Sequence, residues 1–394
     1  MRNSNVNLIN LPEYRCFKND IFEHKIVFHI RPKSKYSVCK KCSVKSSIVY
    51  EHKTRTIQHS SWDTKTTWLK VSQRRFKCKS CGARFWERLP GILPYFRRTE
   101  QLRGQVARAA LRGHDNKGVA SDFKLGEATV QRDINRFTFL KNQEKLSNIC
   151  PEVFGIDEHF FTKKKGYATT FCDLKRSKIF DIRLGKSEKS LNRYLTKLKH
   201  KERCRVVCID LSSSYRAIIR KHFPNAQIVA DRFHVIRTVN HHFIELWKLL
   251  DPSGRKNRGL LSLFRRNPSK LSFEQAQNLD RYLNDIPGLK QSYDFRNHIN
   301  QFLNIKTLDF KTMKPAIKEF NFMIEKLLAS GFNSMVTLAN TFQAWDEEIL
   351  RMLRYTKNNG ITEGYHNKME VISRRAYGFR NFENYRQRVL LQCA

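Results

Sequence analysis

The chain has 394 residues with 75 Lys and Arg against 36 Asp and Glu, a formal net charge of +39. Its 40% hydrophobic content excludes a disordered basic tail, and its length allows two or three folded domains. This charge on folded domains is typical of proteins that bind nucleic acid, with a basic ribosome-associated or membrane-surface protein as the alternative. No apolar run reaches the ~18 residues needed to cross a bilayer. Because the first residues also lack a signal peptide's apolar core, we expect a soluble intracellular protein with no membrane partner.

Two C-x-x-C pairs near the N-terminus predict one four-coordinate zinc site. The gap between the pairs is longer than the about 15–20 residues of a compact zinc ribbon, and its strand-like alternation predicts an inserted β-hairpin. We expect a zinc-ribbon-like DNA-binding module over 1–95, in which Zn²⁺ is structural because protein supplies every ligand. Two unrelated cysteine pairs are the alternative, and His52 and His59 are expected at the surface. The predicted ligands are Cys39, Cys42, Cys78 and Cys81.

The next segment, 96–148, has the pattern of a helix-turn-helix DNA-binding domain. Gly126 falls in the expected turn, and the second helix is predicted from Ala128 to Phe137. An ordinary helical hairpin is the alternative. The residues expected to be buried are Ala120, Leu125, Val130 and Ile134. The residues expected to face the DNA major groove are Thr129, Gln131, Arg132 and Asn135.

From about residue 149 the pattern changes to an α/β alternation. Three strands, a helix, a strand, a helix and a strand follow one another up to residue 236, which is the order of the ribonuclease-H-like fold with its mixed five-stranded sheet. We assign 149–236 and 357–394 to this catalytic domain. The first and fourth strands are neighbours in that fold, so Asp157 and Asp210 are expected to lie close together.

Two carboxylates held together repel, and a divalent cation between them removes the repulsion. Oxygen ligands without histidine or cysteine partners favour Mg²⁺ or Mn²⁺ over zinc. Two such ions can clamp the attacking and leaving oxygens of a phosphodiester. The alternative is that Asp210 only caps the helix that follows it.

A third carboxylate ligand is expected on a helix near the C-terminus. Asn359–Gly360 is expected to interrupt the regular structure, and the helix then starts near Thr362. Glu363 lies in its first turn, where the helix dipole favours an ionised acid. Glu370 is the rival candidate, and the alternative for Glu363 is a solvated acid at the helix N-terminus without a ligand role. Between these parts, 237–356 predicts a helical insertion that contacts DNA or a second protomer. The arginines expected to bind phosphates are Arg374, Arg375, Arg380, Arg386 and Arg388.

Several motifs together resemble the DDE transposases of bacterial insertion sequences, in the ISL-three-type family. They read GIDEHF, CIDLSSSY, VADRFHVIRTVN and, as the most specific, ITEGYHNKMEVISRRAYGFRNFENYRQRVL. The resemblance implies a catalytic triad of Asp157, Asp210 and Glu363. It also places Asp231 in a family-like motif, where we interpret it as a supporting residue that orients His234 and as the main competitor of Asp210.

The resemblance implies a transposase that binds terminal inverted repeats. Metal-activated water would free a 3′-hydroxyl, which then attacks target DNA. Joining two DNA ends implies a homodimer or higher assembly on double-stranded DNA. Two other classes remain open: a DNA-binding regulator with an inactive body, and a ribonuclease-H-like structure-specific nuclease.

Overall fold

The structure is a computed structural model that describes residues 9–62, 65–113, 115–145, 148–355 and 360–394. The chain forms two compact units of mixed α/β structure. Unit 1 comprises Met1–Glu144 and Val371–Gln387, and unit 2 comprises Lys145–Glu370 and Arg388–Ala394. The interruption of regular structure predicted at Asn359 lies outside the described residues.

Unit 1 begins with a five-stranded sheet in the order β1-β2-β6-β5, with β7 paired to β6. Its strands are β1 (Tyr14–Ile21), β2 (Lys25–Pro32), β5 (Val49–Trp62), β6 (Lys65–Lys77) and β7 (Arg84–Trp86), and a small ladder joins β3 (Ser37–Val38) to β4 (Lys45–Ser46). The antiparallel β5–β6 pair confirms the hairpin predicted between the cysteine pairs. The wider sheet was not predicted, because β1 and β2 precede the first C-x-x-C pair.

His59 does not lie at the surface, contrary to expectation. It is only 3% exposed, and its ring bonds to the Thr99 hydroxyl through Nδ1 and to the Ile9 carbonyl through Nε2. Burial lowers its pKa, so the ring is a neutral structural group. The strand period places a residue on a face, but it does not reveal which neighbouring segment covers that face.

Three helices complete this part of unit 1: α1 (Glu100–Leu111), α2 (Asn116–Asp122) and α3 (Glu127–Lys145). Thr99 caps α1 and Asp115 caps α2, each by accepting a backbone N–H bond. The second helix, expected from Ala128 to Phe137, is α3, and it is longer than predicted at both ends. The residues predicted to be buried do share one small core, with Ala120, Val130 and Ile134 buried and Leu125 partly buried.

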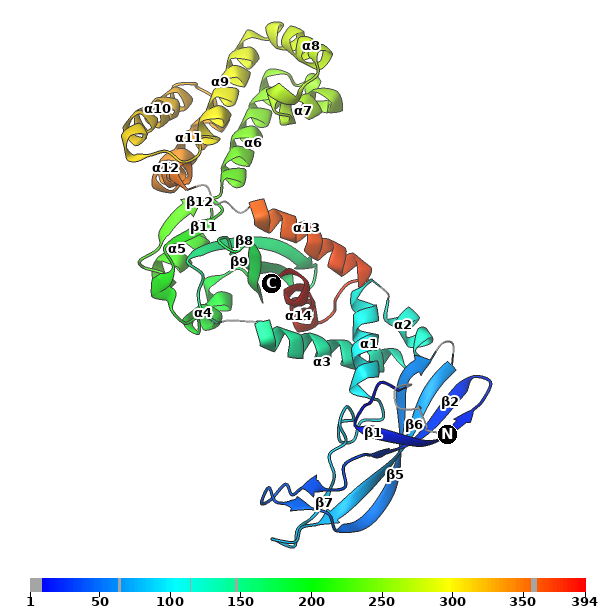
Figure 1. Cartoon of the computed structure of the whole chain (residues 1–394). Helices are drawn as coiled ribbons and strands as arrows, with labels where there is room; N and C mark the ends of the chain where they lie inside the picture. Colours follow the sequence, from blue (N-terminus) through cyan, green and yellow to red (C-terminus); the bar gives the residue numbers. More distant parts are fainter. Residues whose placement is uncertain (1–8, 63–64, 114, 146–147, 356–359) are drawn as a thin grey trace. The chain divides into compact units, whose positions relative to one another are not determined.

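Unit 2 is built on a five-stranded sheet in the order β10-β9-β8-β11-β12 (Figure 1). The strands are β8 (Val153–Thr162), β9 (Gly166–Asp173), β10 (Lys178–Leu184), β11 (Val206–Ile209) and β12 (Gln227–Ala230). The first three pair antiparallel, whereas β8, β11 and β12 run parallel. The first and fourth strands of the segment are thus neighbours, as predicted.

One face of this sheet is closed by α4 (Glu188–Thr196) and α5 (Ser213–His222). Leu191 and Leu195 of α4 and Ile218 of α5 share a core with Phe154 of β8. Ser212 caps α5 by accepting from the Tyr215 N–H. Asp210 is therefore not the helix cap, which removes the alternative left open by the sequence.

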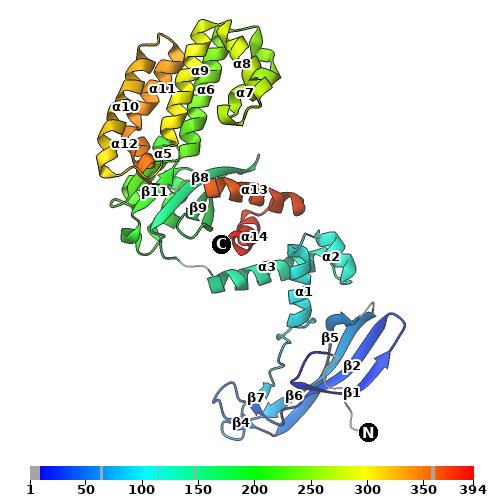
Figure 2. The ribbon, with the colours of Figure 1, turned by 45° about the horizontal axis from the view of Figure 1, so that its top comes forward.

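A helical segment follows β12, and its helices lie packed side by side in both ribbon views (Figures 1 and 2). It consists of α6 (Arg232–Leu250), α7 (Arg258–Arg265), α8 (Phe273–Asn284), α9 (Pro287–Leu303), α10 (Phe310–Leu328), α11 (Asn333–Ala344) and α12 (Asp346–Arg354). Trp247 and Phe264 anchor a core of its own. The helical character predicted for 237–356 is confirmed across the described residues.

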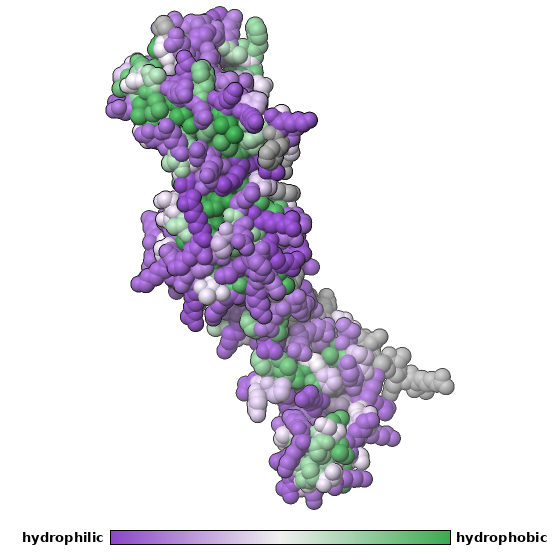
Figure 3. All heavy atoms as spheres, turned by 90° about the vertical axis from the view of Figure 1, so that its left-hand side faces the viewer, coloured by the Kyte–Doolittle hydropathy of each residue, from purple (hydrophilic) through white to green (hydrophobic). Residues whose placement is uncertain are grey.

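Two helices end the chain, α13 (Gly360–Arg375) and α14 (Phe382–Cys393), and the division between the units falls inside both. In unit 2, α13 lies alongside β8 and β9 in both ribbon views. Hydrophilic residues dominate the face drawn in Figure 3. None of the helices in the described part of the chain combines the length and apolar character that a bilayer crossing requires.

Candidate functional site

The four predicted cysteines form a metal site in unit 1. Their sulfur atoms all lie within 4.8 Å of one another, with Cys39 and Cys81 at 3.7 Å and Cys42 and Cys78 at 3.5 Å. A tetrahedral zinc ion with Zn–S bonds of about 2.3 Å requires sulfur–sulfur distances of about 3.8 Å. Hydrogen bonding from the Cys81 backbone holds the pKa of Cys78 below its usual range, which favours the thiolate that binds metal. The residues therefore fit a structural Zn²⁺.

A second polar centre lies where three parallel strands of unit 2 end. Cys208 on β11 pairs with Gly155 on β8, and Asp210 and Asp157 each follow two residues later on the same face. Ala230 on β12 pairs with Ile209, so Asp231 follows directly beside Asp210. The structure thus brings together Asp157, Asp210 and Asp231, which are far apart in the sequence.

The environment of these carboxyl groups disfavours three negative charges. Burial raises the pKa of Asp157 to about 6, and the charges of Asp231 and Asp210 raise it further against the opposing effect of His234. Burial also raises the pKa of Asp210. One Asp210 oxygen, Oδ1, is buried and has no hydrogen-bond partner. An orphaned carboxylate oxygen among repelling acids fits a bound divalent cation, and a donor set of carboxylates fits Mg²⁺ or Mn²⁺.

His234 is a titratable side chain that faces these acids. Its Nδ1 lies 2.6 Å from Asp231 Oδ2. Burial lowers the pKa of His234, but the bond to Asp231 and the charges of Asp157 and Asp210 outweigh burial, so the pKa is raised overall. Asp231 is only 1% exposed and orients this ring, which supports the predicted role of Asp231 beside Asp210.

The predicted third ligand, Glu363, does not close a tight cluster with the two aspartates. It lies exposed in the first turn of α13, and Glu370 is also exposed. Among the described residues, only the four cysteines form a group of three or more metal-binding side chains, with all their ligand atoms within 4.8 Å of one another. The residue by which α13 contacts Asp157 is His366, whose Nδ1 lies 3.8 Å from Asp157 Oδ2.

His366 and its neighbours were missed by the sequence analysis. His366 Nε2 lies 3.1 Å from the Thr170 hydroxyl, and His159 Nδ1 lies 3.0 Å from the same oxygen. Burial lowers the pKa of His366 to about 4 and that of His159 to about 3, so both rings are neutral. The available signal was positional, since His366 lies one helical turn after Glu363.

The residues predicted to contact DNA are only partly exposed. On α3, Arg132 is exposed and its guanidinium donates to the Thr129 hydroxyl, whereas Thr129, Gln131 and Asn135 are half-buried. Gln131 accepts from Asn116 and donates to Asn135. Three arginines that follow Glu363 in the sequence are exposed, as expected: Arg374, Arg375 and Arg380.

Arg386 and Arg388 were expected to bind phosphates, and this is wrong for the structure as described. Both are only 9% exposed, and Arg386 donates to Glu383. They lie on α14, whose other buried residues include Val389 and Leu390. A guanidinium can extend through an apolar layer, so its charge alone does not show that it reaches solvent.

Cys78→Ser should remove the zinc ion. The zinc content should fall from about one ion per chain to near zero, because three thiolates leave the tetrahedral site incomplete. Atomic emission spectroscopy on the purified protein measures this content. Cys16→Ser is the matched control, since Cys16 lies outside the cluster, and zinc retained at the wild-type level in Cys78→Ser would contradict the assignment.

Asp157→Asn should stabilise the metal-free sheet of unit 2. The Asp157 carboxyl has a pKa of about 6 when folded against a reference of 3.8, so it costs nothing below pH 3.8 and destabilises fully above pH 6. The gain in unfolding free energy should reach up to about 3 kcal/mol at pH 8 and vanish near pH 4. Amide hydrogen exchange in β8 and β9, without Mg²⁺ or Mn²⁺, measures it.

Asp181→Asn is the control for this substitution, because Asp181 is buried in the same unit but is already bonded to Arg183 and the Ile182 N–H. It should give no such gain. Equal stability of Asp157→Asn and wild type at pH 8 would show that burial and the neighbouring acids do not disfavour the ionised Asp157 carboxyl.

Comparison with known proteins agrees with the zinc site and identifies the family of the chain. A family model described as transposase matches residues 154–389, and a model described as the zinc-finger of transposase IS204/IS1001/IS1096/IS1165 matches residues 35–81. The transposase for insertion sequence element IS1001 of Bordetella parapertussis is 27% identical over 366 residues, which cover 90% of this chain and 88% of that protein.

A shorter match is to a protein of Lactococcus lactis subsp. lactis named ATP-dependent protease, 26% identical over 133 residues. It covers 33% of this chain and 38% of that protein, so its name carries no weight for the whole chain. The transposase family model, in contrast, spans more than half of the sequence, from the strand of Asp157 through α13. The chain therefore belongs to the ISL-three-type family of DDE transposases.

Proposed function

We propose that this transposase binds the terminal inverted repeats of its own insertion sequence and catalyses DNA strand cleavage and strand transfer at the centre around Asp157 and Asp210. The observation that carries the proposal is the pair of acids, buried Asp157 and half-buried Asp210, at the ends of neighbouring parallel strands in a chain of this family. The strand order of unit 2 supports a ribonuclease-H-like domain formed by 149–236 and 357–394, interrupted by the helical insertion at 237–356.

The proposed chemistry exchanges one phosphodiester for another. Water attacks the phosphodiester at the element's end and frees a 3′-hydroxyl, and that hydroxyl then attacks a target phosphodiester and displaces another 3′-oxygen. Mg²⁺ or Mn²⁺, when bound, would activate the attacking oxygen and stabilise the leaving one. Asp157 and Asp210 would hold this metal, and Glu363 would complete its ligands from α13.

The neighbouring residues orient this centre. Asp231 fixes the His234 ring through Nδ1, and the ring's positive charge offsets the repulsion between Asp157 and Asp210. Glu363 lies on α13 outside a tight cluster with the aspartates. Its exposed side chain would turn toward the positive charge of the metal and complete the ligands.

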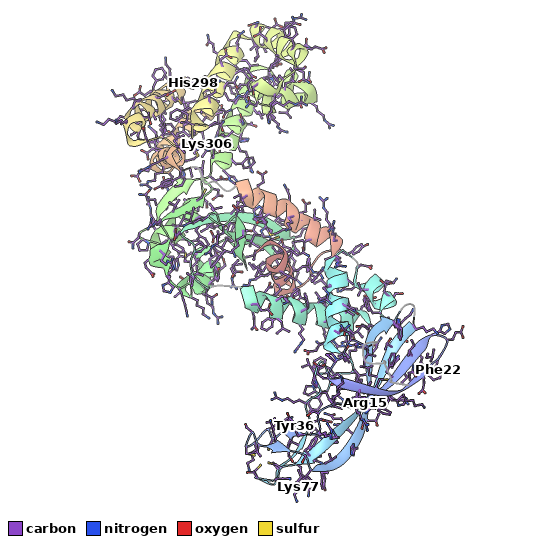
Figure 4. All side chains as sticks on the ribbon, viewed as in Figure 1. Arg15, Phe22, Tyr36, Lys77, His298 and Lys306 are labelled. Atoms are coloured by element: carbon purple, nitrogen blue, oxygen red, sulfur yellow. The ribbon has the colours of Figure 1, made fainter. Side chains whose placement is uncertain are left out.

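DNA binding is proposed for both parts of unit 1, with the zinc module at 1–95 and a helix-turn-helix at 96–148. The proposal rests on the formal charge of +39 and on the exposed basic side chains. Figure 4 shows Arg15 and Lys77 projecting from the N-terminal sheet. On α3, Arg132 would reach the major groove, and Arg374, Arg375 and Arg380 would contact phosphates. Because two ends must be joined, we propose at least a dimer on DNA.

Asp210→Asn and Glu363→Gln should each reduce cleavage of the cognate DNA end by at least about 100-fold, since outer partners of a metal site alone typically cost 10–100-fold. Both proteins should still bind that end. The assay follows Mg²⁺-dependent nicking of a labelled linear end. Glu370→Gln is the matched control on the same helix and should cleave within a few-fold of wild type. Wild-type cleavage by Asp210→Asn would refute the assignment, and binding without any nicking by wild type would favour the regulator.

Arg132→Ala should weaken binding to the cognate end by about 1–3 kcal/mol, because a base contact or a phosphate contact is lost. Lys141→Ala is the control, since nine residues along a helix turn a side chain by about 180° to the opposite face of α3. Gel-shift titrations at one fixed salt concentration compare the two. Equal affinity of both variants and wild type would exclude α3 as the recognition helix.

A further inference from the structure

A buried polar cluster connects α13 to the strand that carries Asp157. Its members are Thr170 on β9, His159 on β8 and His366 on α13. Thr170 is fully buried, and its hydroxyl lies within hydrogen-bond distance of both rings. The two rings also contact each other, with their centroids 5.1 Å apart. Such a cluster is costly to bury unless its bonds are satisfied, so it calls for an explanation.

The spacing of residues on β9 and α13 explains how the helix docks. Thr362 donates to Cys172, while His366 bonds Thr170. Four residues of an α-helix advance by about 6 Å, and two residues of a strand advance by about 6.7 Å. The two pairs therefore match in length, with the helix antiparallel to the strand. Both of these contacts are polar. The position of α13 along β9 is therefore specified by hydrogen bonds as well as by apolar packing.

The register of the sheet places this contact at the acidic centre. Thr170 is the direct pairing partner of Asp157 across the β8–β9 ladder, so both side chains point to the same face. His366 spans from the Thr170 hydroxyl to Asp157, with Nε2 at 3.1 Å from Oγ1 and Nδ1 at 3.8 Å from Oδ2. Its ring thus joins α13 to both members of this cross-strand pair.

One arrangement of protons satisfies the whole cluster. With neutral rings, His159 Nδ1–H donates to the Thr170 hydroxyl, and that hydroxyl donates to His366 Nε2. The remaining proton of His366 is then on Nδ1 and points at the Asp157 carboxylate. The opposite tautomer would turn a nitrogen lone pair toward the carboxylate, which is unfavourable.

We infer that His366 is a positioning residue for the acidic centre. It places Nδ1 3.8 Å from the Asp157 carboxylate, in its electrostatic surroundings, and through the bond to Thr170 it fixes the helix that carries Glu363 at one place relative to that carboxylate. This inference rests on the proposed function, because it assumes that Asp157 holds the divalent cation. The residues of the cluster do not touch substrate; they act through Asp157 and through the position of α13.

The test measures Mn²⁺ binding and DNA cleavage separately in the zinc-loaded full chain. Free Mn²⁺ is titrated by electron paramagnetic resonance, and binding that is absent in Asp157→Asn defines the site. His366→Ala and Thr170→Val should each weaken this Mn²⁺ binding by about 10–100-fold. Cleavage should then need correspondingly more Mn²⁺ and recover toward the wild-type maximum at high concentration.

Two further proteins sharpen the result. The double variant should be no worse than either single one, because both substitutions break the same chain of bonds. Tyr365→Phe is the control: it removes a different contact between α13 and unit 2, the bond from the Tyr365 hydroxyl to the Ser177 carbonyl, and should leave Mn²⁺ binding unchanged. Thr170→Val decides the matter if His366→Ala does not fold, since valine keeps the shape of threonine.

The two proposals fail in different ways. Wild-type Mn²⁺ binding and wild-type metal dependence in both His366→Ala and Thr170→Val would overturn the positioning role alone. Wild-type cleavage by Asp157→Asn would instead overturn the proposed centre and the positioning role together. An equal loss of Mn²⁺ affinity in Tyr365→Phe would show that any loosening of α13 has this effect, and would also overturn the specific role of His366.

Discussion

The parallel pairing of β8 with β11, and of β11 with β12, is the constraint on which the candidate catalytic centre depends. Strands that run in one direction end at one edge, so residues that follow matched pairs share a face. Asp157, Asp210 and Asp231 meet there for this reason. Burial, with a smaller contribution from neighbouring acids, raises the pKa values of Asp157 and Asp210, and His234 offsets only part of this effect.

The zinc site and the proposed acidic metal centre differ in the way their ligands are held. The four thiols of unit 1 are already grouped within 4.8 Å, as a closed structural site requires. The few apolar residues around them include Phe76 and Phe85. They form a core too small to hold the two C-x-x-C turns together without a metal ion. The acidic centre is open by comparison, with Glu363 exposed, which suits a site that must also admit DNA and exchange its ligands during a reaction.

The insertion between β12 and α13 does not disturb the sheet, because it brings a core of its own. Trp247 is fully buried against Phe264 and donates to the Tyr282 hydroxyl, while other helices of the segment extend the main core. The chain can therefore leave the acidic centre at Asp231 and return to it at α13. The return is guided by polar contacts with β9, so Asp157 and Thr170 from the start of the domain's sequence lie beside His366 from its end.

The sequence by itself determined the zinc ligands, the β5–β6 hairpin and the order of the elements in unit 2, because these depend on local spacing and periodicity, and its motifs carried the resemblance to the family. It also identified the acids at the strand ends. Only the tertiary structure decided which polar residues are buried and with which partners. His59 has its partners at Thr99 and Ile9, and His366 meets Thr170 nearly two hundred positions earlier in the chain. Periodicity shows that a face is covered but not by what, and a buried polar side chain is specified by its hydrogen-bond partner, which the fold alone brings near.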